Sequence, residues 1–143
     1  DLEVMFPSDY IENVSERITL YRELDNVTDE ESLGDFQKRL EDRFGKLPQQ
    51  AESLLQMLRL RWLAISLGIE KVILKEEKMI AYLVNNMHSH YYLSEAFGAI
   101  INYMAKHPKN TQLREKNSRR YVVFTNIPTI DRAYTILYAI RQQ

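Results

Sequence analysis

The segment LEDRFGKLP, residues 40–48, ends one predicted helix, makes a turn and begins the next helix. Phe44 is the apolar side chain at the corner, and Gly45 tolerates the left-handed backbone that a helix end needs. Pro48 presets the first turn of the following helix. The corner does not need the charges of Asp42 and Arg43. We therefore treat these two side chains as candidates for a contact outside the corner, although Arg43 is also placed to stabilise the end of its own helix.

Helical spacing extends on both sides of this corner. Apolar residues recur at three and four over residues 10–24, which predicts a first helix. Thr28 stands three residues before Glu31, a capping-box pattern that predicts the start of a second helix ending at Phe44. A third helix follows Pro48 and ends at Gly68. The side chains expected to face the core are Ile11, Val14, Ile18, Leu20, Tyr21 and Leu24 in the first helix, Leu33, Phe36 and Leu40 in the second, and Ala51, Leu54, Leu55, Leu58, Trp62 and Ile65 in the third.

The pattern changes after Gly68 and repeats a hairpin-then-helix order twice. Residues 69–74 and 79–84 are rich in β-branched residues and flank a charged turn, and residues 91–104 return to helical spacing. Asn117–Ser118 is a candidate two-residue turn between residues 112–116 and 119–125, and a last helix follows Pro128. This order predicts an α+β fold in which N-terminal helices precede two β-hairpin/helix units that form a small antiparallel sheet. We treat residues 1–143 as one domain, with a helical part at about 8–68 and a hairpin/helix part at about 69–143.

The composition excludes several classes of protein. The chain has no cysteine, which excludes a disulfide scaffold, a thiol nucleophile and a zinc ribbon. It has no apolar run long enough for a membrane span, so we expect a cytoplasmic protein without membrane contact. It begins at Asp1 without an initiator methionine, as a fragment of a longer protein would. The net charge of −1 is unevenly distributed, because residues 1–35 carry eleven acids and two bases.

We find no catalytic, cofactor-binding or metal-binding residues in the sequence. His88 and His90 would share one side of a strand, but the nearest acid in the sequence, Glu95, is not enough to complete a metal site. No phosphate-binding loop or dinucleotide fingerprint is present, and Ser89 and Ser94 lack the context of a nucleophile. We therefore predict a domain that is not an enzyme. A small enzyme would require a convergent polar pocket.

A basic segment supports an alternative function. The six bases between residues 106 and 120 are Lys106, Lys109, Arg114, Lys116, Arg119 and Arg120. Bases near Tyr121 and Phe124 resemble the charge-plus-aromatic pattern of nucleic-acid-binding proteins. Tyr121 and Phe124 would point to opposite faces of a strand, however, and would form no stacking row. A nucleic-acid-binding module using residues 109–120 is the alternative, and we do not expect DNA contact by this domain.

Several motifs around the corner carry a resemblance to a known family. Residues 42–48 resemble the D-R-F-G-x-L-P signature in the C-terminal domain of the bacterial transcription-repair coupling factors, the Mfd family. Residues 7–11 are similar to the P-x-x-Y-I entry of that family, and residues 17–22 to its R-L-x-L-Y-K helix. The match continues through the L-L and L-G-I motifs to about Ile69, and beyond it only the order of elements agrees.

The resemblance implies a non-catalytic regulatory domain of a DNA translocase in transcription-coupled nucleotide excision repair. It implies that the domain packs on the UvrB-like module of the same protein, masks the surface that binds UvrA, and restrains the motor until RNA polymerase is engaged. Carried over by position, the interdomain contact falls on Arg39, Asp42 and Arg43. The family usually has an acid at the position of Arg39, so in this chain the charge reversal would exchange one interdomain ion pair for another or remove it.

Overall fold

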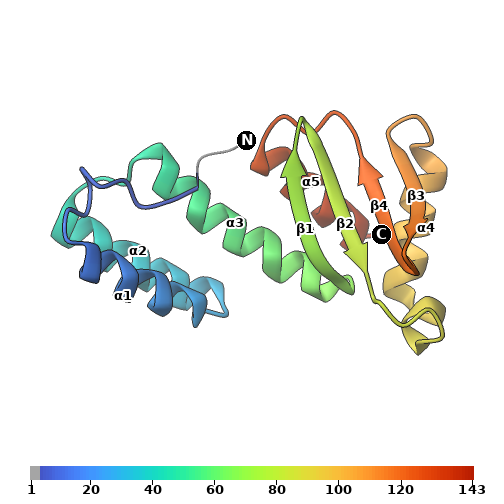
Figure 1. The fold of residues 1–143 in the computed structure, drawn as a ribbon, viewed down its shortest axis with the longest axis horizontal. Coiled ribbons are helices and arrows are strands. Elements are labelled where there is room, and N and C mark those ends of the chain that lie inside the picture. The colour runs from blue at the N-terminus through green and yellow to red at the C-terminus, as the bar shows by residue number, and fades with distance from the viewer. Residues whose placement is uncertain (1–3) are drawn as a thin grey trace. The chain divides into compact units, whose positions relative to one another are not determined.

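The computed structural model describes residues 4–143 and has the predicted α+β architecture (Figure 1). Its elements are α1 (Val14–Asp25), α2 (Glu30–Phe44), α3 (Gln49–Ser66), β1 (Ile69–Lys75), β2 (Lys78–Leu83), the 3-10 helix η1 (His90–Leu93), α4 (Glu95–Lys106), β3 (Thr111–Lys116), β4 (Arg119–Phe124) and α5 (Ile130–Arg141). Its described residues form two compact units, which divide within α3 between Arg59 and Leu60. We describe each unit by itself.

The helical unit, residues 4–59, has a core that includes the predicted face of α2. Leu33, Phe36 and Leu40 are all at most 2% exposed. The prediction for the first helix was partly wrong, because α1 begins only after its N-cap Asn13 and leaves Val14 and Ile18 exposed. The segment before α1, which turns at residues 8–10, fills the core instead, with Phe6 and Ile11 buried. The Tyr21 hydroxyl accepts a hydrogen bond from the Phe6 backbone N–H at 2.9 Å and ties this segment to α1.

The second unit, residues 60–143, contains the sheet, in which β2 pairs with β4 and the strand order is β1-β2-β4-β3. Both hairpins turn through two residues with positive φ, Glu76–Glu77 and Asn117–Ser118, as the right-handed twist of the strands favours. Burial alternates along β2 and β4, and the buried face includes Met79, Ala81, Leu83, Val122 and Phe124. The helices α4 and α5 lie behind this sheet in the view of Figure 1.

The helices of this unit also depart from the sequence prediction in detail. The predicted helix at residues 91–104 is divided, because Ser94 ends η1 and caps α4 by accepting a hydrogen bond from the Phe97 N–H. Ile65, expected to face the core, is 62% exposed near the end of α3, whereas Leu63, Ala64 and Leu67 are buried. The apolar stripe of α3 therefore does not continue along the face predicted for Ile65.

Tyr91 packs against the glycine that follows α3. Gly68 has a φ of +74°, and a methyl group added there would lie 2.6 Å from Cδ1 of Tyr91 and overlap the ring. The Tyr91 hydroxyl donates a hydrogen bond of 2.7 Å to the carbonyl oxygen of Leu67, and burial raises the pKa of this phenol. Gly68 is therefore needed both for its backbone conformation and for the space that the ring occupies.

We predict that Gly68→Ala lowers the free energy of unfolding by about 2–4 kcal/mol, because it combines left-handed backbone strain with overlap against Tyr91. Gly98→Ala is the matched control, since Gly98 lies inside α4 with nothing within 4 Å of the added methyl group. The control should be neutral or stabilising by up to about 1 kcal/mol. Urea unfolding followed by circular dichroism measures both variants. Equal stabilities would show that the Tyr91 ring moves aside without cost.

Candidate functional site

The three residues expected at an interface, Arg39, Asp42 and Arg43, are all exposed on α2. Arg39 and Arg43 are four residues apart, so they lie one above the other on the same side of the helix. Both line a surface hollow of about 240 Å³, and Asp42 does not. The structure therefore brings the two arginines together and leaves the Asp42 carboxylate outside the hollow.

Both arginines form ion pairs with acids of α1. The Nη2 atom of Arg39 lies 2.6 Å from Oε1 of Glu23, and that of Arg43 lies 2.7 Å from Oε2 of Glu16. The arginine side chains nevertheless remain 61% and 67% exposed. Since exposed ion pairs contribute only about 0–1 kcal/mol, the guanidinium groups can exchange partners at little cost. For Arg43, the ion pair joins two helices and does more than stabilise the end of its own helix.

The floor of the hollow is apolar. Leu20 of α1 and Phe36, Leu40 and Phe44 of α2 line it together with the charged side chains. The guanidinium carbon of Arg39 lies 5.7 Å from the centroid of the Phe36 ring, and that of Arg43 lies 5.1 Å from the centroid of the Phe44 ring. The arginine stems therefore cover aromatic surface while their charged ends stay in water. An apolar floor with charged edges has the composition of a small protein-binding surface.

The corner after α2 is held by Tyr10. Gly45 has φ +90° and ψ −172°, a conformation that is essentially restricted to glycine. The Tyr10 hydroxyl donates a hydrogen bond of 2.7 Å to the Gly45 carbonyl oxygen, and its ring centroid lies 5.7 Å from that of Phe44. Burial, and secondarily the Glu41 carboxylate, raise the pKa of Tyr10. These contacts fix the end of α2 next to Arg43.

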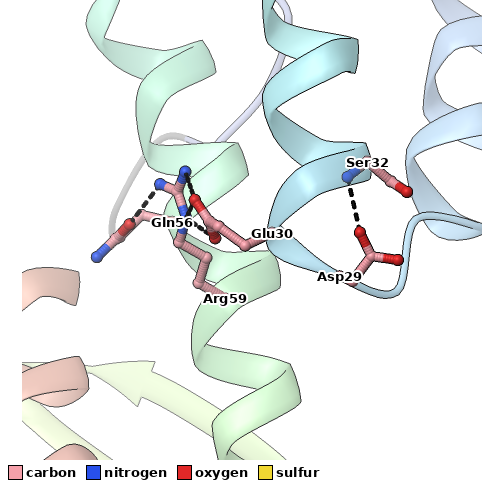
Figure 2. Close-up of polar contacts among 5 residues, drawn as sticks. All are labelled: Asp29, Glu30, Ser32, Gln56 and Arg59. Carbon is pink, nitrogen blue, oxygen red and sulfur yellow. Dashed lines mark hydrogen bonds and ion pairs between the residues drawn. The ribbon is translucent and has the colours of Figure 1, made fainter.

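The start of α2 is held by one cap and one ion pair, which Figure 2 shows. The predicted cap at Thr28 was wrong by one residue: the Asp29 carboxylate accepts a hydrogen bond of 2.7 Å from the Ser32 N–H. Arg59 of α3 donates to both carboxylate oxygens of Glu30, at 2.9 Å and 2.7 Å. Asp29 prevails because a carboxylate both caps the helix and interacts favourably with the dipole at its N-terminus.

Asp29 should make the stability of this unit depend on pH. The hydrogen bonds from Ser32 lower the pKa of Asp29 below its ordinary value of 3.8. A lowered folded-state pKa means that the stabilisation is present above the unfolded-state pKa and is lost as the pH falls through the folded-state value. Asp29→Asn keeps a capping oxygen without the charge. We predict that wild type is more stable than Asp29→Asn at pH 7, and that this difference shrinks as the pH falls below 3.8, the ordinary pKa of the carboxyl group. Thermal unfolding over a series of pH values measures it, and a difference that does not change with pH would contradict the assignment.

A double-mutant cycle tests how firmly the candidate arginine is held. For Glu16→Gln and Arg43→Gln we predict a coupling energy of about 0.2–1 kcal/mol that falls with added salt, because the pair is exposed. The same cycle on Glu30 and Arg59 is the control. Because Arg59 donates hydrogen bonds to both carboxylate oxygens of Glu30, this bidentate pair should give a coupling energy at or above the upper end of that range. A salt-independent coupling of more than about 2 kcal/mol for Glu16–Arg43 would mean that Arg43 is a fixed structural residue.

The histidines and the basic segment identified in the sequence belong to the second unit. His88 and His90 are exposed, and among residues 4–143 no group of three His, Asp or Glu side chains is placed to hold a metal ion. The bases of the 106–120 segment are divided between the faces of the sheet unit, since Arg119 lies over the Tyr82 ring and Arg120 over the Tyr92 ring. No helix within the described part of the chain is long and apolar enough to cross a membrane.

The sequence did not identify Glu16 and Glu23 as part of this site. Their spacing around Leu20 places all three on one side of α1, but many acids in this region share such spacing. Only the packing of α1 against α2 selects these two carboxylates as the partners of Arg43 and Arg39.

Comparisons with known proteins agree on one family. The family model of the TRCF domain matches residues 1–93 of this chain. A transcription-repair-coupling factor of Escherichia coli strain K12 is 38% identical over 68 residues, which are 48% of this chain and 6% of that protein. One from Rickettsia prowazekii is 22% identical over 121 residues, 85% of this chain and 10% of that protein. This chain therefore spans a tenth or less of these relatives. A crystal structure of the C-terminal domain of a transcription-repair coupling factor has the same fold, with a TM-score of 0.70, 16% identity, and coverage of 99% of this chain and 91% of that one.

Proposed function

Because this chain belongs to the TRCF domain family of transcription-repair coupling factors, we propose that it is a non-catalytic regulatory domain of a cytoplasmic DNA repair translocase. In this proposal α2 docks on the UvrB-like module of the same protein. Docking masks the surface that binds UvrA and restrains the motor until RNA polymerase is engaged. ATP hydrolysis and DNA translocation belong to other parts of the protein.

The observation that carries the proposal is the exposed arginine pair beside an apolar hollow. Arg39 and Arg43 keep most of their surface in solvent although each has an ion pair, and Asp42 is exposed beside them. A partner with carboxylates facing the arginines and a cation facing Asp42 would be complementary to this surface. Such a contact is polar and exchangeable, as expected for an interface that must open.

The required strength of this contact is moderate. A docked state populated at 99:1 needs about 2.7 kcal/mol, which a few partly desolvated ion pairs and a small apolar centre can supply. Loss of about 1.4 kcal/mol would raise the open fraction about tenfold, from roughly 1% to roughly 10%. Substitution of one arginine should therefore release the motor measurably without abolishing docking.

The test uses the full-length protein that carries this domain. We predict that Arg43→Ala raises basal ATP hydrolysis and UvrA binding several-fold, up to about tenfold, and that Arg39→Ala/Arg43→Ala has a larger effect. Arg141→Ala, an exposed substitution in the last turn of α5, is the control and should leave both measurements unchanged. Circular dichroism checks that each variant is folded. Wild-type values of both measurements in the double variant would remove this surface from the docking interface.

A further inference from the structure

The second unit has a sheet face on which two tyrosines lie side by side. Tyr82 on β2 is directly opposite Tyr121 on β4, and their ring centroids are 5.3 Å apart. Both are on the face opposite to the buried residues Ala81 and Val122, and both are only half-buried. Neither α4 nor α5 lies over this side of the sheet in Figure 1. The two tyrosines belong to the two central strands, so the aromatic surface lies in the middle of the sheet.

Cations surround this aromatic pair. The strand register places Lys71 opposite Tyr82 and Arg114 opposite Tyr121, on the two edge strands. Lys116 and Arg119 are opposite each other. Each lies two residues along its strand from Arg114 or Tyr121, and therefore on the same face. We call these residues the tyrosine face: Lys71, Tyr82, Arg114, Lys116, Arg119 and Tyr121.

The tyrosine face has few acids to balance its four cations. Glu70, at the irregularity in β1, forms an ion pair of 3.2 Å with Arg119. Glu76 and Glu77 lie in the β1–β2 turn, beyond the Lys75–Lys78 pair and away from Tyr82 along both strands. Arg119 also has a buried Nε atom that finds no acceptor among residues 4–143. The Arg119 side chain as a whole is still 34% exposed, so an anion can bind the accessible part of its guanidinium group.

We propose that the tyrosine face binds single-stranded nucleic acid, with phosphates at the cations and bases against the tyrosine rings. Four cations against one paired carboxylate favour a polyanion over a neutral partner. Adjacent aromatic rings on a sheet face favour unpaired bases, because the bases of a duplex are stacked on one another and expose only their edges. Arg119 and Lys71 already lie over the Tyr82 ring, at 5.0 Å and 6.0 Å from its centroid, so charge and aromatic surface are within reach of one nucleotide.

This site shares Arg114, Lys116 and Arg119 with the basic hairpin at residues 109–120, which the sequence offers as an alternative nucleic-acid-binding site. The sequence places Tyr121 and Phe124 on opposite faces of a strand, and in the structure they do face opposite sides of β4 and form no stacking row. The pairing of β2 with β4 supplies Tyr82 as the second ring. The proposal is independent of the docking surface, because Arg39, Asp42 and Arg43 belong to the helical unit.

The test is binding of a fluorescent oligothymidylate of about 12 nucleotides to the 143-residue chain, followed by anisotropy at several salt concentrations. With four phosphates neutralised, the slope of log K against log salt should be about −3. Tyr82→Leu and Tyr121→Leu keep apolar bulk but remove the ring, and each should weaken binding about tenfold. Tyr138→Leu changes an exposed tyrosine of α5 and should have no effect.

A second pair of variants separates charge from folding. Lys116→Gln should reduce the magnitude of the salt slope by about 0.7, whereas Lys106→Gln, at the end of α4, should not change it. The proposal is overturned if the wild-type chain does not bind the oligonucleotide at low salt, or if a duplex of equal length binds as tightly. The proposal is also overturned if polyglutamate displaces the fluorescent oligonucleotide as effectively as unlabelled oligonucleotide does. The tyrosine face would then recognise an acidic polypeptide. If the folded Tyr82→Leu and Tyr121→Leu variants bind the oligonucleotide as tightly as wild type, the tyrosines do not take part in binding.

Discussion

The hydrogen-bonded pairing of β2 with β4 makes one sheet out of two hairpins. A two-stranded hairpin alone is marginal in water, whereas a four-stranded sheet with a buried face can support helices. The register joins Met79 to Phe124 and Ala81 to Val122 on the buried face, and Tyr82 to Tyr121 on the other. A slip of one residue would exchange the two faces, so burial of the core fixes the tyrosine pair in place. Packing of the buried face therefore determines which side chains lie on the tyrosine face.

The helical unit couples a core to a surface in a similar way. Burial of Phe36 and Leu40 sets the rotation of α2, and this rotation directs Arg39 and Arg43 toward the acids of α1. The ends of the helix are fixed separately, by the Asp29 carboxylate at its start and by the Tyr10–Gly45 hydrogen bond at its end. The exposed charges therefore sit on a well-anchored element, although the charges themselves are held only by surface ion pairs.

Most features set by neighbouring residues were predicted from the sequence, although the cap of α2 is Asp29 and not Thr28, whereas features set by distant residues were not predicted. The two-residue turn at Asn117–Ser118, the end of α2 at Gly45 and the apolar face of α2 depend on local chemistry, and all are confirmed. The exposure of Val14 and Ile18 was missed because the segment before α1, with Phe6 and Ile11, fills the core instead. Asp42 and Arg43 followed from the charges that the corner does not need, and Arg39 followed from a family resemblance. The tertiary structure was required to identify Glu16 and Glu23 as the partners of the two arginines, and to show that Tyr82 lies beside Tyr121.

The existing ion pairs also constrain how the proposed docking would work. A carboxylate arriving from a partner must compete with Glu16 for Arg43 and with Glu23 for Arg39. Exchange of one exposed ion pair for another is nearly neutral in Coulomb energy, so the charges select and orient the partner more than they strengthen the complex. Net stabilisation must then come from removing water from the half-buried side chains of the floor, Leu20 and Phe44. Because Glu16 lines the hollow, its carboxylate, once released from Arg43, would favour a partner that also brings a cation.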